Sequence, residues 1–315
     1  MALVIKRISG KNYYYSFLIY RVLNKPKGFS KYIGIAKPTK QKLALLEDSF
    51  KEELIKKLSG KEYSAGSLDK DEIIKTLLFA KHFNQKYQKL TELKRRKYDV
   101  DSTVSFILTT LTTEEVDVDL NDVKNALVKT SKLTERERIS RNMLNAVESI
   151  KHRHKLDKKY LLSLHKTIMA SFKTKTPGKL RDRQVYLYRK GEHEPIQNTE
   201  LKYRPPGYSE INNMIDDFLD WYDRSGLNPI EKASTAHYKL YKIHPFLDGN
   251  KRICRLVFNK TLIDNDFPLI NLSVEKELYF DALASAVETD RPQLFVDFSL
   301  GQYYKQVKMF LKENL

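Results

Sequence analysis

The spacing of hydrophobic positions changes along this chain. In the first forty residues, β-branched and aromatic stretches at 3–6, 13–21 and 31–34 are separated by turn-forming residues at 9–12 and 24–28. This alternation predicts a three-stranded antiparallel meander. A sheet of this size is marginal by itself, so we expect it to pack against another element.

From Lys40 onward, apolar residues recur at steps of three and four, which is typical of amphipathic helices. One helix is predicted from Lys40 to Gly60, and a second begins near Asp71. Beyond Asp101 the same spacing predicts helices at 112–128, 135–150, 157–172, 209–222, 229–243, 251–264 and 294–311. The predicted fold class is therefore mainly α.

One segment interrupts the helical pattern, at 177–206. Residues 184–188 alternate and Gly191 offers a turn, so we predict a β-hairpin that projects from the helical body. The chain then has three predicted regions. They are a basic β-meander at 1–38, a helical connector at 39–100 and a helical domain at 101–315.

The composition is that of a globular protein. Of the 315 residues, 41% are hydrophobic and 11% aromatic, which is enough for a packed core and excludes wholesale disorder. The single Cys254 excludes a disulfide framework and favours a reducing cytosol. No apolar run approaches the ~18–20 residues that span a bilayer, and Lys6 and Arg7 follow too soon for a secretory leader. We therefore predict a cytoplasmic protein without a membrane partner.

The net charge of +17 attracts anions, which include nucleic acid, acidic proteins and phosphate-bearing substrates. A lysine-rich surface that serves solubility explains the charge equally well, because the lysines are spread along the whole chain. The basic, tyrosine-rich meander could stack on nucleic acid. A sheet half-buried against a helix is the favoured interpretation of the same pattern.

One stretch concentrates chemically useful residues. It reads His-Pro-Phe-Leu-Asp-Gly-Asn-Lys-Arg from His244 to Arg252 and continues to Arg255. Pro245 ends the predicted helix 229–243, which holds His244 at its tip, and the next helix begins near Asn250. The free N–H groups and positive dipole end of that second helix form an anion pocket.

Each residue type in this stretch suits a phosphate site. Gly249 lets a phosphate approach the backbone, and two arginines three positions apart reach one polyphosphate. Asp248 is a candidate Mg²⁺ ligand, and His244 can take a proton near neutral pH. An ordinary helix stop and turn would explain neither the acid nor the arginines. The residues favour phosphoryl or nucleotidyl transfer to a hydroxyl.

The stretch resembles the signature of Fic-domain proteins, His-x-Phe-x-Asp/Glu-Gly-Asn-Gly/Lys-Arg. The resemblance extends over about residues 101–310. It includes Pro-Gly-Lys-Leu-Arg at 177–181, which together with the short strand predicted after it is similar to the family's flap, and Tyr-Arg-Pro-Pro at 203–206. Ala-His-Tyr at 236–238 also matches. The resemblance implies a Fic-type helical bundle with a β-hairpin flap.

The resemblance also implies adenylylation, in which AMP moves from ATP to a Ser, Thr or Tyr hydroxyl of a target protein. On that basis His244 is the general base and Asp248 holds Mg²⁺. The implied nucleotide-binding residues are Gly249 and Asn250 in the anion hole, Lys251, Arg252 at the β-phosphate and Arg255 at the γ-phosphate. The implied docking flap for the target contains Val185, Tyr186, Leu187 and Tyr188.

Lys251 departs from the usual pattern, since most adenylylating members have glycine there. Lysine also occurs in the related death-on-curing toxins, which transfer the γ-phosphate. Those toxins generally have alanine where this chain has Gly249, and they lack the second arginine. AMP transfer is therefore favoured over phosphate transfer. A nucleic-acid-associated regulatory protein, acting through the basic N-terminal region, is the remaining alternative.

Many relatives carry an inhibitory helix with the pattern Ser/Thr-x-x-x-Glu, whose glutamate pairs with the second arginine. Aligned on residues 102–110, this pattern puts Leu108 at the glutamate position. Three alternatives stay open: self-inhibition is lost, Glu114 or Glu115 substitutes, or a partner supplies the acid. The working hypothesis is that Arg255 is free for ATP. Elsewhere, Phe246, His237 and Cys254 are predicted to be buried core residues.

Overall fold

The computed structural model describes residues 2–186 and 203–313, which form two compact units. The first unit contains the residues up to Lys89, Gly226–Asn228 and the residues from Tyr304 onward. The second contains Leu90–Ser225 and Pro229–Tyr303. The predicted boundaries at 38 and 100 differ from these, because the first two helices pack on the sheet instead of forming a separate connector.

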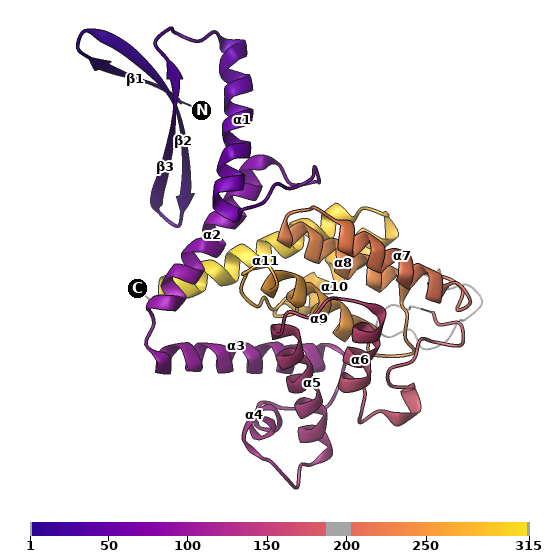
Figure 1. The fold of residues 1–315 in the computed structure, drawn as a ribbon. Coiled ribbons are helices and arrows are strands. Elements are labelled where there is room, and N and C mark those ends of the chain that lie inside the picture. Colours follow the sequence, from indigo (N-terminus) through magenta and orange to yellow (C-terminus); the bar gives the residue numbers. More distant parts are fainter. Residues whose placement is uncertain (1, 187–202, 314–315) are drawn as a thin grey trace. The chain divides into compact units, whose positions relative to one another are not determined.

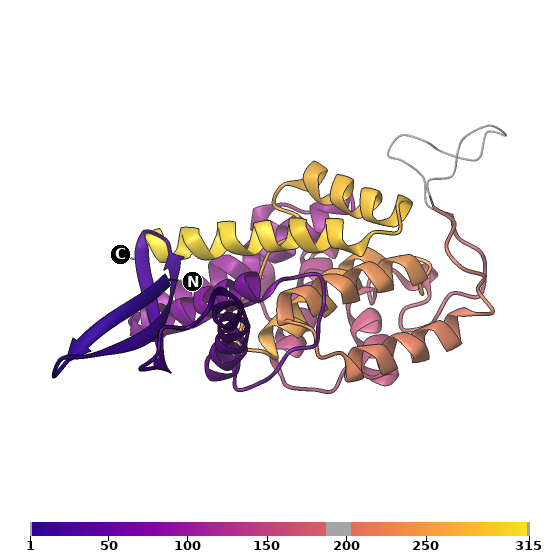
Figure 2. The ribbon, with the colours of Figure 1, turned by 90° about the horizontal axis from the view of Figure 1, so that it is seen from above.

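The N-terminal strands form the expected antiparallel meander. Strands β1 (Ala2–Ile8), β2 (Lys11–Val22) and β3 (Lys25–Gly34) pair in that order (Figure 1), and Figure 2 shows them from above. Alternate residues of β2 are buried: Tyr14, Ser16, Leu18, Tyr20 and Val22. The sheet therefore has one inner face that packs on helices and one outer face.

Two helices cover the inner face of the sheet. Helix α1 (Lys40–Ser59) begins at the Thr39 cap and ends at Gly60, whose φ of 71° confirms the predicted stop. Helix α2 (Lys70–Lys89) follows. The Tyr20 hydroxyl donates a hydrogen bond to Asp71 of α2, at 2.7 Å, and thereby ties the sheet to this helix.

The second unit is helical and confirms the mainly α class. Its elements are α3 (Glu92–Thr113), α4 (Leu120–Val128), α5 (Glu135–Lys151), α6 (Lys158–Ile168), the short η1 (Lys173–Lys175), α7 (Ile211–Arg224), α8 (Pro229–Ile243), α9 (Asn250–Ile263), α10 (Lys276–Glu288) and the first part of α11 (Pro292–Glu313). Their apolar faces meet in one core, which includes Phe106, Met143, Leu164, Leu240 and Leu256. Across the described ranges, the structure contains no helix whose length and hydropathy would allow it to cross a membrane.

Helices α3, α4 and α10 differ from the sequence prediction, which placed no helix over most of α3. The predicted helix 112–128 is divided, because Glu115 adopts a φ of 58° after α3 ends. Asp119 then starts α4 with a capping box in which it and Asp122 bond each other's backbone N–H groups. Helix α10 was not predicted, although Tyr279 and Leu283 give it an apolar stripe at helical spacing.

The predicted hairpin flap is not a strand where the structure describes it. Val185 and Tyr186 are irregular, while Leu187 and Tyr188 lie outside the described residues. Alternating sequence forms a strand only when a neighbouring strand pairs with its backbone, and the described residues supply none for Val185 and Tyr186. The docking role of these four residues stays a prediction.

Candidate active site

The loop between α8 and α9 is closed by a side chain rather than by backbone pairing. The Asn250 side-chain oxygen accepts a hydrogen bond from the Phe246 N–H at 2.9 Å, and its amide donates to the Phe246 carbonyl at 2.8 Å. Phe246 is fully buried, as predicted, and stacks on His165 with ring centroids 3.7 Å apart. The Asn250 side chain is therefore used to shape the loop, and its backbone N–H remains as the polar group that could bind a ligand.

Gly249 occupies a position that no other residue fits without strain. Its φ is 78°, and a Cβ built on it would lie 2.9 Å from the Met169 sulfur. The residue directly precedes α9 and leaves the helix without a side-chain cap. The turn thus brings the unprotected end of α9 into the loop.

The first turn of α9 has unused donors. Its first backbone N–H group with an acceptor is that of Ile253, which bonds the Gly249 carbonyl. Among the described residues, the N–H groups of Asn250, Lys251 and Arg252 have none. Three free donors at the positive end of a helix form an anion site.

Two buried arginines add further unused donors to this turn. Arg252 is 2% exposed and Arg255 is fully buried. Each uses one terminal nitrogen for hydrogen bonds, whereas the Nε and Nη1 groups of both have no partner among the described residues. Buried guanidinium donors are costly to leave unpaired, so the site favours a polyanion that would satisfy them.

Asp248 is a partly exposed carboxylate that pairs with Arg252. One carboxylate oxygen accepts from the Gly249 N–H at 2.5 Å and from the Arg252 guanidinium at 3.0 Å. Its side chain is 36% exposed. No group of three His, Cys, Asp or Glu side chains within the described ranges could hold a metal alone. Asp248 therefore fits a metal ion only if phosphate oxygens supply further ligands.

The His244 ring keeps one nitrogen without a hydrogen-bond partner among the described residues. It has a φ of 49°, and its Nδ1 lies 3.3 Å from the Tyr241 carbonyl. A carbonyl can only accept, so Nδ1 carries the proton and Nε2 presents its lone pair. Burial, together with the charges of Lys251 and Arg181, lowers the pKa of His244 to about 4. The ring is therefore neutral at pH 7.

Comparison with known proteins identifies this helix pair. The model of the Fic/DOC family matches residues 155–262, which include the complete loop and both arginines. This segment is a Fic domain. The predicted resemblance is thus confirmed for the part of the chain that contains the site.

The Fic domain has relatives among characterised proteins. Protein adenylyltransferase Fic of Drosophila willistoni is 32% identical over 158 residues, which cover 49% of this chain and 29% of that protein. Protein adenylyltransferase fic-1 of Caenorhabditis elegans is 35% identical over 118 residues, or 36% of this chain and 21% of that protein. The chain spans less than a third of the length of the curated relatives it matches.

Solved structures show the same fold. A Fic family protein from Desulfovibrio desulfuricans G20 has a TM-score of 0.62 at 20% identity, over 80% of this chain and 76% of that chain. A Fic domain containing signaling protein from Bacteroides thetaiotaomicron has a TM-score of 0.63 at 20% identity, over 77% of this chain and 96% of that chain.

The hypothesis that Arg255 is free is wrong, because the carboxylate of Glu114 pairs with this arginine of α9. Glu114 directly follows α3 and accepts from Arg255 Nη2 at 2.8 Å, while its other oxygen lies 3.2 Å from Lys251 Nζ. Burial raises the pKa of Glu114, but the adjacent cations more than compensate and hold it below its usual range. Leu108 packs against the core instead. Thr110 and Glu114 have the Ser/Thr-x-x-x-Glu spacing, six residues later than the sequence alignment placed it.

Two further residues of the Fic domain support the loop, and no role was predicted for either from the sequence. His165 Nε2 donates to the Asp248 carbonyl at 3.0 Å, and its Nδ1 accepts from the Gly178 N–H at 2.9 Å. Arg181 Nε donates to the His244 carbonyl at 2.8 Å. Both side chains are buried. Two features of the sequence could have indicated these roles. They are a histidine in the apolar stripe of α6 and the arginine that ends the 177–181 motif.

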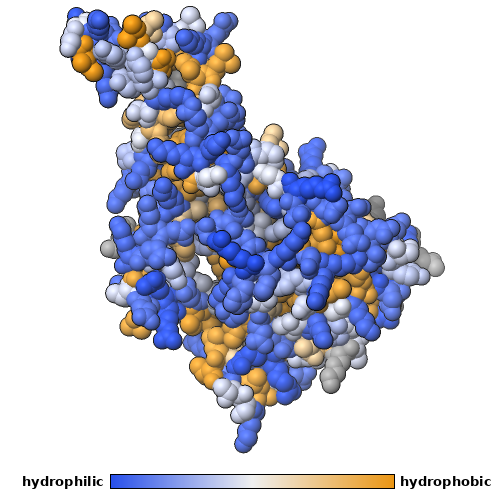
Figure 3. Space-filling view, viewed as in Figure 1, coloured by the Kyte–Doolittle hydropathy of each residue, from blue (hydrophilic) through white to orange (hydrophobic). Residues whose placement is uncertain are grey.

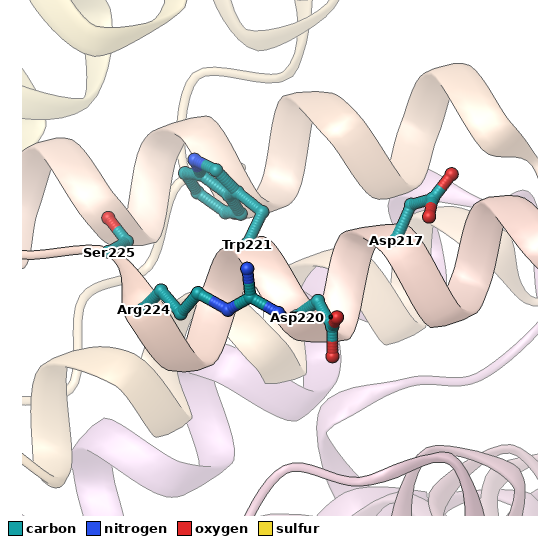
Figure 4. Close-up of a pocket in the computed structure, with 5 residues that line it drawn as sticks. All are labelled: Asp217, Asp220, Trp221, Arg224 and Ser225. Carbon is teal, nitrogen blue, oxygen red and sulfur yellow. Dashed lines mark hydrogen bonds and ion pairs between the residues drawn. The ribbon is translucent and has the colours of Figure 1, made fainter.

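A separate depression lies along α7. It has a volume of about 430 Å³ and is lined by Asp217, Asp220, Trp221, Arg224 and Ser225 (Figure 4). Arg224 extends along the helix and pairs with Asp220 at 2.9 Å. None of these residues belongs to the loop between α8 and α9. This depression is therefore not the candidate active site.

Proposed function

We propose that this chain is a protein adenylyltransferase that transfers AMP from ATP to a Ser, Thr or Tyr hydroxyl of a target protein. The relatives of its Fic domain are named for this activity. The observation that carries the proposal is a neutral His244 at the end of α8, together with four unpartnered guanidinium nitrogens on Arg252 and Arg255 and three free backbone N–H groups at the start of α9. These donors and this base are the parts that hydroxyl attack on a bound triphosphate requires.

In the proposed complex the triphosphate lies over the first turn of α9. The N–H groups of Lys251 and Arg252 would bind phosphate oxygens, with Gly249 allowing close approach. The side chains of Arg252 and Arg255 would contact the β- and γ-phosphates. This placement satisfies the donors that are unpartnered in the free protein.

The chemical step follows from the position of His244. Its Nε2 takes the proton from the target hydroxyl as the hydroxyl oxygen forms a bond to the α-phosphorus. The bond between that phosphorus and the bridging oxygen to the β-phosphate breaks, and pyrophosphate leaves with the electron pair. The target then carries AMP as a phosphodiester, and His244 returns its proton to solvent.

Asp248 fits a Mg²⁺ ion that also binds phosphate oxygens, since Mg²⁺ is commonly held by one carboxylate together with substrate phosphates. The ion would neutralise charge on the leaving pyrophosphate. The carboxylate also accepts from Arg252, so the same residue keeps this guanidinium oriented toward the loop.

Glu114 would hold the free protein in a resting state. Its bond to Arg255 uses the nucleotide donor that we assign to the γ-phosphate, in line with the inhibitory glutamate implied by the family resemblance. Nucleotide with three phosphates then binds fully only when Glu114 moves away. A cytoplasmic location suits the proposal, because the single thiol, Cys254, is buried and unpaired.

Labelling with ATP tests the proposal. The chain is incubated with Mg²⁺, a lysate of its source and ATP labelled at either the α- or the γ-phosphate. Transfer of the α label alone supports adenylylation, and transfer of the γ label alone would instead support the death-on-curing type of phosphotransfer. No transfer of either label, also from a Glu114→Gly variant, would contradict both.

Two variants make the labelling specific to this site. His244→Ala is expected to abolish transfer, because it removes the proton acceptor. Glu114→Gly is expected to raise transfer, and Glu115→Gly serves as its matched control. Glu115 is the exposed neighbour and has no bond to the arginines among the described residues.

A further inference from the structure

The outer face of the N-terminal sheet presents a row of aromatic rings. The β2 residues whose side chains alternate with the buried ones are Tyr13, Tyr15, Phe17, Ile19 and Arg21. Strand register adds Lys6, opposite Tyr13, and Tyr32, opposite Tyr15, to the same face. The inner face already packs on α1 and α2, so burial within this unit does not explain the outer rings.

The rings form a group rather than isolated side chains. The centroid of Tyr32 lies 5.4 Å from that of Tyr15 and 6.2 Å from that of Tyr13. Tyr32 is 50% exposed. Phe17 continues the row across Gly28, where a Cβ would come within 2.6 Å of its ring. Glycine at this position therefore lets an aromatic ring lie flat along the sheet.

The charge around this face has one sign. Residues 1–46 contain ten Lys and Arg and no Asp or Glu. On the inner side, Lys31 is neutralised by Glu53. Among the described residues, no carboxylate pairs with the outer-face cations Lys6 and Arg21. Lys6 Nζ lies 4.7 Å from the centre of the Tyr15 ring, which places a cation directly beside the aromatic row.

Apolar area is also exposed on this sheet. Ile19, one of the outer-face residues of β2, is 57% exposed. Figure 3 shows hydrophobic side chains exposed among hydrophilic ones on the sheet. Flat rings, exposed apolar area and excess cations therefore occur together on one small surface.

We propose that the outer face of this sheet binds single-stranded nucleic acid, with bases stacked on Tyr13, Tyr15 and Tyr32 and phosphates held by Lys6 and Arg21. Stacking on aromatic side chains beside a cationic groove is how single strands are bound without sequence preference. Duplex bases are already stacked on each other and cannot use these rings. Lys6 and Arg21 lie at opposite ends of the row, about 26 Å apart along β2 at the usual rise per residue, which suits a short oligonucleotide.

Fluorescence anisotropy with a labelled 12-nucleotide oligo(dT) or oligo(U) and the full chain tests this proposal. We expect Tyr32→Ala and Tyr15→Ala each to weaken binding about tenfold, in line with the loss of one stacked base. The matched control is Tyr208→Ala, since Tyr208 has a similar exposure, 53%, but lies in the other unit. Arg21→Gln should reduce the slope of log binding constant against log salt concentration by about one, which corresponds to one lost phosphate contact. Lys124→Gln on α4 should leave this slope unchanged.

The proposal fails under any of three results. One is no oligonucleotide binding at low salt, and another is equal binding of a duplex of the same length. The third is an equal effect of Tyr32→Ala and Tyr208→Ala. Vesicles of phosphatidylcholine with 30% phosphatidylserine are tested in parallel, and binding to vesicles but not to oligonucleotides would assign the face to membranes instead. Circular dichroism checks that each variant is folded.

Discussion

Replacing Glu114 with glycine tests whether the second arginine is reserved for a nucleotide. The carboxylate is held by Arg255 at 2.8 Å and by Lys251 at 3.2 Å, with only 12% of its side chain exposed. A hydrogen bond between charged groups contributes about 1.5–3 kcal/mol. A nucleotide that must break this bond to reach Arg255 therefore loses that amount of binding free energy. Removing the Glu114 carboxylate should tighten ATP binding about 10- to 150-fold.

The assay is isothermal titration calorimetry with ATP and Mg²⁺ in a His244→Ala background, so that no turnover occurs. ADP serves as the comparison ligand, because it lacks the γ-phosphate that we assign to Arg255. The increase in affinity caused by Glu114→Gly should be smaller for ADP than for ATP. Lys251→Ala should increase the affinity for ATP by an intermediate amount, since it leaves the bond between Glu114 and Arg255 in place.

The same variant has a predictable effect on stability. Without Glu114, the fully buried guanidinium of Arg255 loses its only carboxylate partner among the described residues, which should cost the free protein about 1–3 kcal/mol. ATP should restore the loss in a thermal unfolding experiment. The reasoning would be refuted if Glu114→Gly bound ATP no better than the Glu115→Gly control.

Three further predictions concern the loop itself. His165→Phe keeps the ring stack on Phe246 but leaves the Gly178 N–H and the Asp248 carbonyl unpaired. The labelling rate should therefore fall at least tenfold, mainly through a lower kcat. An unchanged kcat would contradict the positioning role of His165. Gly249→Ala should lower the Tm measured by thermal unfolding, because of the φ of 78° and the nearby Met169 sulfur. The pKa values of about 4 for His165 and His244 lie below the unfolded value near 6.5, so the unfolded chain binds more protons in between. The free energy of unfolding should therefore fall as the pH drops from about 6.5 to 4, by on the order of 3 kcal/mol for each histidine, and urea titrations at several pH values measure it.

The ends of the helices that position the site were predicted correctly where a single residue determines them. Helix α8 begins and ends where predicted, because Pro229 favours a helix start and Pro245 cannot continue one. Gly60 marks the end of α1 in the same way. In each case the residue that decides the structure acts on its own backbone, so the sequence is sufficient.

Contacts between distant segments were not predictable in this way. Glu114 and Arg255 are 141 positions apart, and the pattern Ser/Thr-x-x-x-Glu was aligned six residues too early. A pattern of two fixed residues has several registers in a segment rich in Ser and Thr. Only the length of α3 decides which register faces α9, and that length depends on the positive φ of Glu115.

The loop and the first two turns of α9 carry more positive than negative charge. Lys251, Arg252 and Arg255 lie within two turns at the positive end of α9, and among the described residues only Asp248 and Glu114 pair with them. Two carboxylates do not balance three cations and a helix N-terminus, and several guanidinium donors stay unpartnered. Such an arrangement costs folding free energy unless an anion completes it. A polyphosphate would supply both the missing negative charge and the missing acceptors, whereas Glu114 supplies only part of each. In the proposed function, Glu114 is therefore a carboxylate that the nucleotide can displace.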